Sequence, residues 1–267
     1  MTTAHPAPVY FVSHGAPTFA LEPGILGAKL HALGSELKDI RAVLVVSPHW
    51  QTRGVRVSTD VSPETIHDFG GFPSKLYDLQ YPAIGAPDVA AQAVQLLSDA
   101  GYDTAVDRGR GLDHGAWVPL MHLLPQAPLP VFQVSMPFDL TAEQAVHLGR
   151  TLAPLREKGV LILTSGSMTH NLGEFRQGVP RGDHYVQEFA DWVITAVRAN
   201  AVNALIQYRT EAPHAARAHP SEEHFLPLLV AMGAQRPGES ATLIEGGIEH
   251  GMLSMDSFVW GQETTVH

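Results

Sequence analysis

The chain contains no cysteine. This absence excludes disulfides, thiolate metal sites, iron–sulfur clusters and a cysteine nucleophile, so any metal must be bound by His, Asp or Glu. Positive charge is also scarce, because 17 Lys and Arg face 27 Asp and Glu and give a formal net charge of −10. Nucleic-acid-binding surfaces place Lys and Arg opposite phosphates, so this balance argues against a nucleic-acid partner.

Long hydrophobic runs are missing as well. No apolar stretch reaches the ~18 to 20 residues that a membrane-spanning helix requires, and the N-terminal MTTAHPAPVYFVSHG lacks the basic start and apolar run of a signal peptide. We therefore expect a cytoplasmic protein with no membrane partner. The 267 residues include 45% hydrophobic and 16% charged side chains, a globular composition without visible repeats or linkers. A single domain over residues 1–267 is the expectation.

Strand-like and helix-like segments alternate along the chain. Short apolar runs predict strands at 9–12, 42–47, 129–135 and 160–165, with a last strand near 241–245. Helical spacing and start signals predict helices at 25–38, 88–100, 141–157, 183–199 and 222–233. This alternation indicates an α/β fold with a central, mostly parallel or mixed sheet flanked by helices. Residues 62–87 are rich in Gly, Pro and aromatic side chains, which indicates a long functional loop.

Histidine is the residue type in excess, with 15 copies against 17 Lys and Arg. His14 and His49 each stand directly beyond a predicted strand, and His170 follows a third one. The carboxyl ends of strands are where open α/β sheets bind ligands. Taken singly, each of these histidines also fits a turn residue that is hydrogen-bonded to backbone, but all three together favour a shared crevice.

Three further histidines are candidates. His219 and His224 lie in AHPSEEHFLPLL, close to the predicted start of a helix, and His114 lies in GLDHGAWVPL. A core or surface position is the plainer interpretation of each. No local zinc signature such as HExxH is present, and the GxSxG elbow of serine hydrolases is missing although Ser165-Gly166-Ser167 looks superficially similar.

Seven sequence blocks carry a resemblance to a known family. They are FVSHGAP, VVSPHW, TIHDFGGFPSKLYDLQYPAIG, GLDHGAWVPL, SGSMTHNL, HPSEEHFLPLL and GMLSMDSF, in unbroken order from about residue 11 to 258. Together they resemble the class III extradiol dioxygenases, specifically the DOPA 4,5-dioxygenase type. Any one block, SHG for example, is weak, whereas the ordered set is highly specific.

The resemblance implies a non-haem Fe(II) enzyme that uses O2 to open a small catechol, such as DOPA or caffeate, next to its diol and yields a muconate-type semialdehyde. By position in the blocks, His14, His49 and His224 match the metal ligands. His170 matches the acid/base histidine and His114 a catalytic histidine of the pocket. About three neutral imidazoles suit such a site, because a catechol and O2 both need open coordination positions.

The expected substrate-binding residues are His67, Asp68, Phe72 and His219. His67 and Asp68 match a block at the family's substrate entrance, and Phe72 belongs to the aromatic side chains of the 62–87 loop, which offer a flat ring a large contact area.

Several alternatives stay open on the sequence alone. The wider superfamily often uses two histidines and a carboxylate, which draws attention to Glu222 and Glu223 beside His224, and His170 is a candidate fourth ligand. Zn(II) suits the same histidines, so a zinc-dependent hydrolase is a second enzymatic interpretation. A non-catalytic binding protein on this scaffold is a third. The resemblance leaves the physiological catechol open and is compatible with a monomer or a small homo-oligomer.

Overall fold

A computed structural model describes residues 5–177 and 184–262. Its centre is an eight-stranded sheet in the order β4-β3-β5-β2-β6-β1-β10-β7. The strands are β1 (Val9–Ser13), β2 (Ala42–Thr52), β3 (Val55–Ser58), β4 (Thr104–Asp107), β5 (Val131–Pro137), β6 (Val160–Gly166), β7 (Thr242–Ile244) and β10 (Ser257–Trp260). A separate pair joins β8 (Ile248–Glu249) to β9 (Leu253–Ser254).

The middle of the sheet is parallel and its edges are mixed. β2 pairs in parallel with β5 and β6, and β6 pairs in parallel with β1. β10 runs antiparallel to β1 and to β7, and β3 meets β5 in antiparallel orientation. The central strands are continuous apolar runs because helices cover both faces. The expectation of an α/β fold with a mixed sheet is therefore confirmed.

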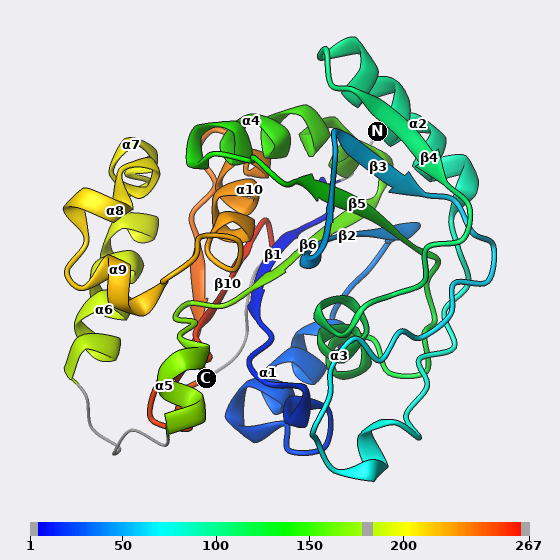
Figure 1. The fold of residues 1–267 in the computed structure, drawn as a ribbon. Helices are drawn as coiled ribbons and strands as arrows, with labels where there is room; N and C mark the ends of the chain where they lie inside the picture. The colour runs from blue at the N-terminus through cyan, green and yellow to red at the C-terminus, as the bar shows by residue number, and fades with distance from the viewer. Residues whose placement is uncertain (1–4, 178–183, 263–267) are drawn as a thin grey trace.

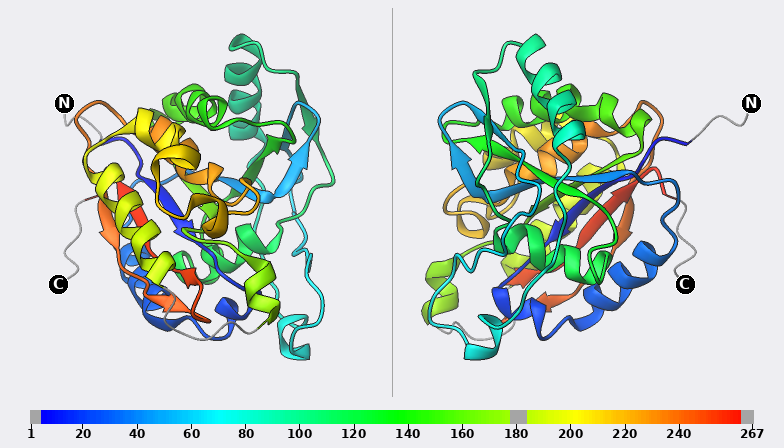
Figure 2. Two further views of the ribbon diagram at one scale, coloured as in Figure 1. Left: turned by 60° about the vertical axis from the view of Figure 1, so that its left-hand side comes forward. Right: turned by 90° about the vertical axis from the view of Figure 1, so that its right-hand side faces the viewer.

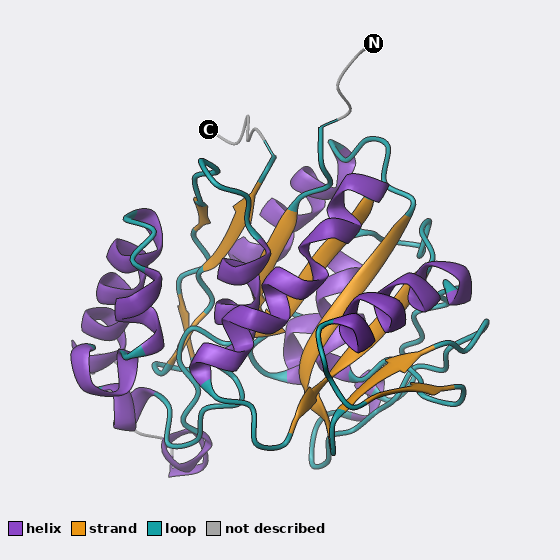
Figure 3. Cartoon of the chain, turned by 90° about the horizontal axis from the view of Figure 1, so that it is seen from above, coloured by secondary structure: helices purple, strands orange, loops and turns teal. Residues whose placement is uncertain are grey.

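Helices cover the sheet on both faces (Figure 1). α1 and α3 pack together on one side of the sheet, and α4 and α10 pack on the other. The short helices α7 to α9 group with α6 on one flank (Figure 2), and the view from above shows helices layered over the strands (Figure 3). The helices are α1 (Gly24–Ser35), α2 (Pro87–Asp99), α3 (His114–Leu123), α4 (Ala142–Leu152), α5 (Leu172–Gln177), α6 (His184–Arg198), α7 (Val202–Ile206), α8 (Tyr208–Glu211), α9 (Ala215–Ala218) and α10 (Leu226–Ala234), with 3-10 turns η1 (Pro17–Ala20), η2 (Ser74–Leu76) and η3 (Ala153–Lys158).

Close packing of α4 against α10 depends on two glycines. A Cβ at Gly149 would lie 2.0 Å from the carbonyl oxygen of Val230, and a Cβ at Gly233 would lie 2.0 Å from that of Val146. Only glycine permits this approach of two helix backbones. The contact holds α10, and with it the turn that precedes α10, firmly over β6 and β1.

Most predicted elements are present, and the differences have physical reasons. β3, β4 and β10 were not predicted because they are only four residues long and carry weak periodicity. α3 was missed because it is apolar on nearly all sides and contains Pro119, so it lacks an amphipathic stripe. The helix predicted from 222 starts at Leu226 instead, so His224 precedes α10, and Asp183 of the predicted helix 183–199 lies outside the described residues.

Within the described part of the chain, no helix is both long and apolar enough to cross a membrane.

Candidate metal centre and catechol pocket

His14 is placed by the end of β1 and by the glycine that follows it. Gly15 has φ +59, and a Cβ there would lie 2.7 Å from the sulfur of Met255. The turn therefore needs glycine, and it directs the His14 ring away from the strand. The His14 Nδ1 lies 2.8 Å from the Ser165 Oγ on β6, which leaves Nε2 facing the site.

His49 lies in an irregular stretch of β2 rather than beyond the strand. The pairing of β2 with β5 shifts register between Val46 and Gln51, and Pro48 in this stretch has no N–H to donate to a ladder. The irregularity turns His49 toward His14, and the Nε2 atoms of the two rings lie 3.1 Å apart. The Arg110 Nη2 donates to the His49 carbonyl at 3.3 Å, which helps to hold the backbone of this irregular part of β2.

His224 comes from the turn just before α10. Its Nδ1 lies 3.0 Å from the Glu223 Oε1, and its buried Nε2 has no hydrogen-bond partner. The His170 ring lies flat on the His224 ring, with centroids 3.5 Å apart and planes 9° apart. His170 follows β6, so the stack joins the loop after β6 to the turn before α10.

His114 is the first residue of α3 and is held by Asp68 from the long loop. The Asp68 Oδ1 accepts from both the backbone N–H and the Nδ1 of His114, each at 2.9 Å. These two hydrogen bonds fix the orientation of the His114 ring. Its Nδ1 is bonded to Asp68, and its Nε2 is left for other partners. Burial works against ionisation of Asp68, but the hydrogen bonds and charge of His114 prevail and lower the pKa of Asp68 to about 2.

Burial keeps four clustered histidines neutral, namely His14, His49, His170 and His224. It lowers the pKa of His14 and of His224 well below the ordinary value, and the neighbouring histidine rings add to the effect. Burial also lowers the pKa of His49 and of His170 to about 4, with partial opposition from Asp113 and Glu223 respectively. Neutral imidazoles at pH 7 offer free nitrogen lone pairs, the form in which histidine binds metals.

The donor set fits a metal ion. One nitrogen from each of His14, His49 and His224 lies within 4.8 Å of the others. The unpartnered Nε2 of His224 and the facing Nε2 atoms of His14 and His49 are the arrangement expected when lone pairs converge on a cation. Two overlapping groups, His49 with Asp68 and His114, and His170 with Glu223 and His224, also meet this distance.

A hollow of about 600 Å³ opens over the histidines, a size in the range of small-molecule sites. It is lined by His14, Gly15, Ala16, Pro17, His49, Asp68, Phe69, Gly70, Gly71, Phe72, His114, His170, Leu172, His224 and Leu253. The 62–87 loop contributes five consecutive residues to one wall. Asp68 and Phe72 are thus in the pocket, as expected of residues near a substrate.

Two predicted substrate contacts, His67 and His219, are not among the residues that line this hollow. His67 lies behind Phe69, with ring centroids 5.8 Å apart, and its Nε2 is 3.0 Å from the Leu79 carbonyl oxygen. His219 is fully buried beside Phe189 and Phe225. Both side chains contact protein atoms that support the pocket instead of lining it.

Sequence reasoning missed two side chains that orient the histidines. Ser165 was considered only as part of a hydrolase-like motif, yet its hydroxyl holds His14. Glu223, which the sequence offered as an alternative ligand, has its carboxylate 3.0 Å from the His224 Nδ1 and also belongs to the group with His170 and His224. A usable signal existed for Ser165, which together with Thr164 brings buried polar side chains to the end of the apolar run of β6.

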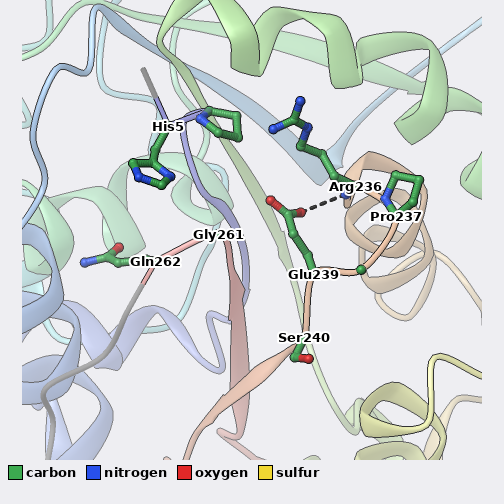
Figure 4. Close-up of a pocket in the computed structure, with 9 residues that line it drawn as sticks. His5, Arg236, Pro237, Glu239, Ser240, Gly261 and Gln262 are labelled. Carbon is green, nitrogen blue, oxygen red and sulfur yellow. Dashed lines mark hydrogen bonds between the residues drawn. The ribbon is translucent and has the colours of Figure 1, made fainter. Parts of the chain in front are cut away.

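A second hollow of about 700 Å³ lies at the opposite end of β1 (Figure 4). His5 and Pro6 line it from before β1, and Gly261 lines it from after β10. Glu239 faces it while accepting from the Arg236 backbone N–H at 2.7 Å and pairing with the buried Arg156. None of the clustered histidines reaches this hollow.

Comparisons with known proteins agree with this site. Residues 1–246 match the family model of the catalytic LigB subunit of aromatic ring-opening dioxygenase. A 4,5-DOPA dioxygenase extradiol from Beta vulgaris is 38% identical over 257 residues, covering 93% of this chain and 94% of that protein. Its namesake from Escherichia coli K12 is 37% identical over 256 residues, covering 93% and 92%.

A solved structure supports the same assignment. The crystal structure of an uncharacterized protein from Escherichia coli K12 aligns with a TM-score of 0.76 and 31% sequence identity, covering 95% of this chain and 99% of that one. Neither a hydrolase nor a non-catalytic binding protein is favoured by these findings. The chain belongs to the family of the catalytic LigB subunit of aromatic ring-opening dioxygenases and is a class III extradiol ring-cleaving dioxygenase.

Proposed function

We propose that this dioxygenase uses Fe(II), bound by His14, His49 and His224, to open the ring of a small catechol of the DOPA or caffeate kind. The observation that carries the proposal is the convergence of three neutral imidazoles, two of them buried and one of these with an unpartnered Nε2. A bound ferrous ion supplies the Lewis-acid and redox chemistry that brings a catechol and O2 together. Zn(II) suits the same ligands and is expected to occupy the site without supporting ring cleavage.

The protein orients its ligands through their outer nitrogens. Ser165 holds the Nδ1 of His14, and Glu223 holds the Nδ1 of His224, so both rings present Nε2 to the metal. Such outer partners fix the tautomer and raise the basicity of a ligating imidazole. Glu223 therefore acts as an orienting carboxylate, and His224 as the third ligand.

Two further histidines are placed to handle protons. His170 lines the pocket and is neutral at pH 7 because burial lowers its pKa to about 4, so its ring has a nitrogen lone pair free to accept a hydrogen bond from a catechol hydroxyl. His114 is held by the Asp68 carboxylate at Nδ1, which leaves Nε2 to accept or donate a hydrogen bond at the substrate. We assign the main acid/base role to His170 and a supporting catalytic role to His114.

The hollow suits a single aromatic ring. Phe69 and Phe72 stand on one wall with ring centroids 5.6 Å apart, and the four histidines His14, His49, His114 and His224 form the floor. A flat catechol gains contact area against the aromatic wall while its diol reaches the histidines. The relatives named for DOPA suggest DOPA as the first substrate to test, with caffeate as the second.

The deciding experiment is anaerobic reconstitution with Fe(II), followed by O2 uptake against DOPA, caffeate, protocatechuate and unsubstituted catechol. We expect one O2 consumed per ring opened and a yellow semialdehyde. Reconstitution with Zn(II) is the matched control and should give neither signal. Absence of O2 uptake with every catechol at full iron occupancy would refute the proposal.

A further inference from the structure

The loop that carries His170 is joined to the segment before α10 by four hydrogen bonds. The backbone N–H of Ser167 donates to the His224 carbonyl at 2.9 Å, and that of His170 donates to the Ala218 carbonyl at 2.8 Å. Beyond His170, the Asn171 Nδ2 donates to the Arg217 carbonyl at 2.8 Å. Two of the four bonds join backbone groups, the third uses the Asn171 amide, and the fourth uses a fully buried ring.

That fourth bond comes from His219. Its Nε2 lies 2.9 Å from the Met168 carbonyl oxygen, so the ring donates through Nε2. Its Nδ1 is buried without a partner, which is consistent with a neutral ring. Phe189 and Phe225 flank the ring with centroids 5.5 and 5.2 Å away, so it has little room to reorient.

We propose that His219 is a positioning residue that acts through the Met168 carbonyl to hold His170 flat against His224. Met168 lies two residues before His170, inside the joined segment, and the stacked rings lie directly beyond it. Loss of this hydrogen bond frees the loop at its buried side while His14, His49 and His224 keep their places. The kinetic consequence rests on the proposed acid/base role of His170, whereas the positional consequence does not.

Two amide variants separate the ring nitrogens of His219. In His219→Gln the side-chain amide reaches the place of Nε2 and can still donate to Met168, whereas in His219→Asn the amide reaches only the place of Nδ1. With the full-length Fe(II)-loaded enzyme, we expect kcat to fall about tenfold in His219→Asn, the scale of one hydrogen bond. KM and metal content should stay near normal, and His219→Gln should recover most of kcat.

A readout without turnover tests the position of His170 itself. In the Zn(II)-loaded protein, the stacked ring should give His170 ring protons a strong ring-current shift in NMR spectra. We expect this shift to be lost in His219→Asn and retained in His219→Gln. A matched control is His122→Asn, because the Nε2 of His122 donates to the Phe19 carbonyl at 2.9 Å from the far end of α3, and it should change neither signal.

Each outcome decides the matter. Equal kcat and retained ring shifts in both His219 variants would overturn the proposal, and so would activity kept by Asn but lost by Gln, which would make Nδ1 the working atom. If ring shifts follow the proposal while His170→Ala leaves kcat unchanged, the positional role holds and the acid/base role fails. Should His219→Asn not fold, His219→Gln is compared with the wild-type protein, and loss of its kcat or of its His170 ring shift would contradict the proposal.

Discussion

At the residue scale, the proposed metal ligands are separable from the side chains that orient them. Replacing His14, His49 or His224 with Ala should abolish stoichiometric metal binding, because each removes one of three converging nitrogens. Glu223→Gln should keep a full equivalent at saturating metal but weaken affinity by ~10- to 100-fold, the usual effect of losing an outer-shell partner. Metal per chain, measured by plasma emission after dialysis, checks both. If His224→Ala kept its full metal content and Glu223→Gln lost it, Glu223 would be the third ligand and His224 would not.

His170 permits a second test at the same scale. His170→Ala should retain its metal while turnover falls ~10²-fold or more, the scale of removing a proton-transfer group. The physical reason is that His170 stacks on His224 and leaves free the His224 Nε2, the atom proposed to bind the metal. Metal content and kcat measured on one preparation check this. Loss of the metal together with activity would place His170 among the ligands.

At the element scale, the 62–87 loop is expected to govern substrate choice. Phe69 and Phe72 form the aromatic wall, and His67 packs behind Phe69. Phe72→Ala and His67→Ala should therefore shift kcat/KM among DOPA, caffeate and protocatechuate while iron content stays near normal. His67 acts indirectly in this prediction, through the ring that it supports.

A matched control lies directly before the loop. Val61 is 67% exposed and does not line the pocket, so Val61→Ala should leave all three kcat/KM values unchanged. Uniform losses on every catechol, accompanied by a lower unfolding temperature, would show that the loop serves only stability.

At the scale of the whole molecule, the buried histidines should make the metal-free protein acid-sensitive. Burial lowers the pKa of His49 and His170 to about 4 and that of His219 to about 3, whereas the unfolded chain titrates near 6.5. The unfolded state then binds more protons as pH falls from about 6.5 toward 4, so stability decreases across that window. Each such histidine contributes up to roughly 1.4 kcal/mol per pH unit. Urea unfolding of the apo-protein at pH 7 and pH 5 checks the sign, and equal midpoints would contradict it.

Added metal should counter this loss. An ion that binds only the folded state stabilises it by about 2.7 kcal/mol at a concentration of one hundred times Kd.

The monomeric or small homo-oligomeric state and the cytoplasmic location stay predictions at this scale, to be tested by sedimentation and by cell fractionation.

The sequence by itself determined the fold class and the identity of the clustered histidines. Continuous apolar runs such as 42–47 and 160–165 can be buried only in a covered sheet, and the absence of cysteine left His and carboxylates as the available ligands. The order of the motif blocks, which local periodicity cannot supply, indicated the dioxygenase family. Their position after predicted strands indicated His14, His49 and His170 as candidates.

Only the tertiary structure decided which histidines reach the pocket. His67 and His219 stand in motifs as suggestive as those of the other candidates, yet both point into protein. The hydrogen bonds that organise the site join residues 46 or more positions apart in the sequence. They pair Asp68 with His114, Ser165 with His14, and His219 with Met168. Such pairs depend on how strands and turns meet in space, and neither residue spacing nor hydrophobic period encodes that meeting in one chain.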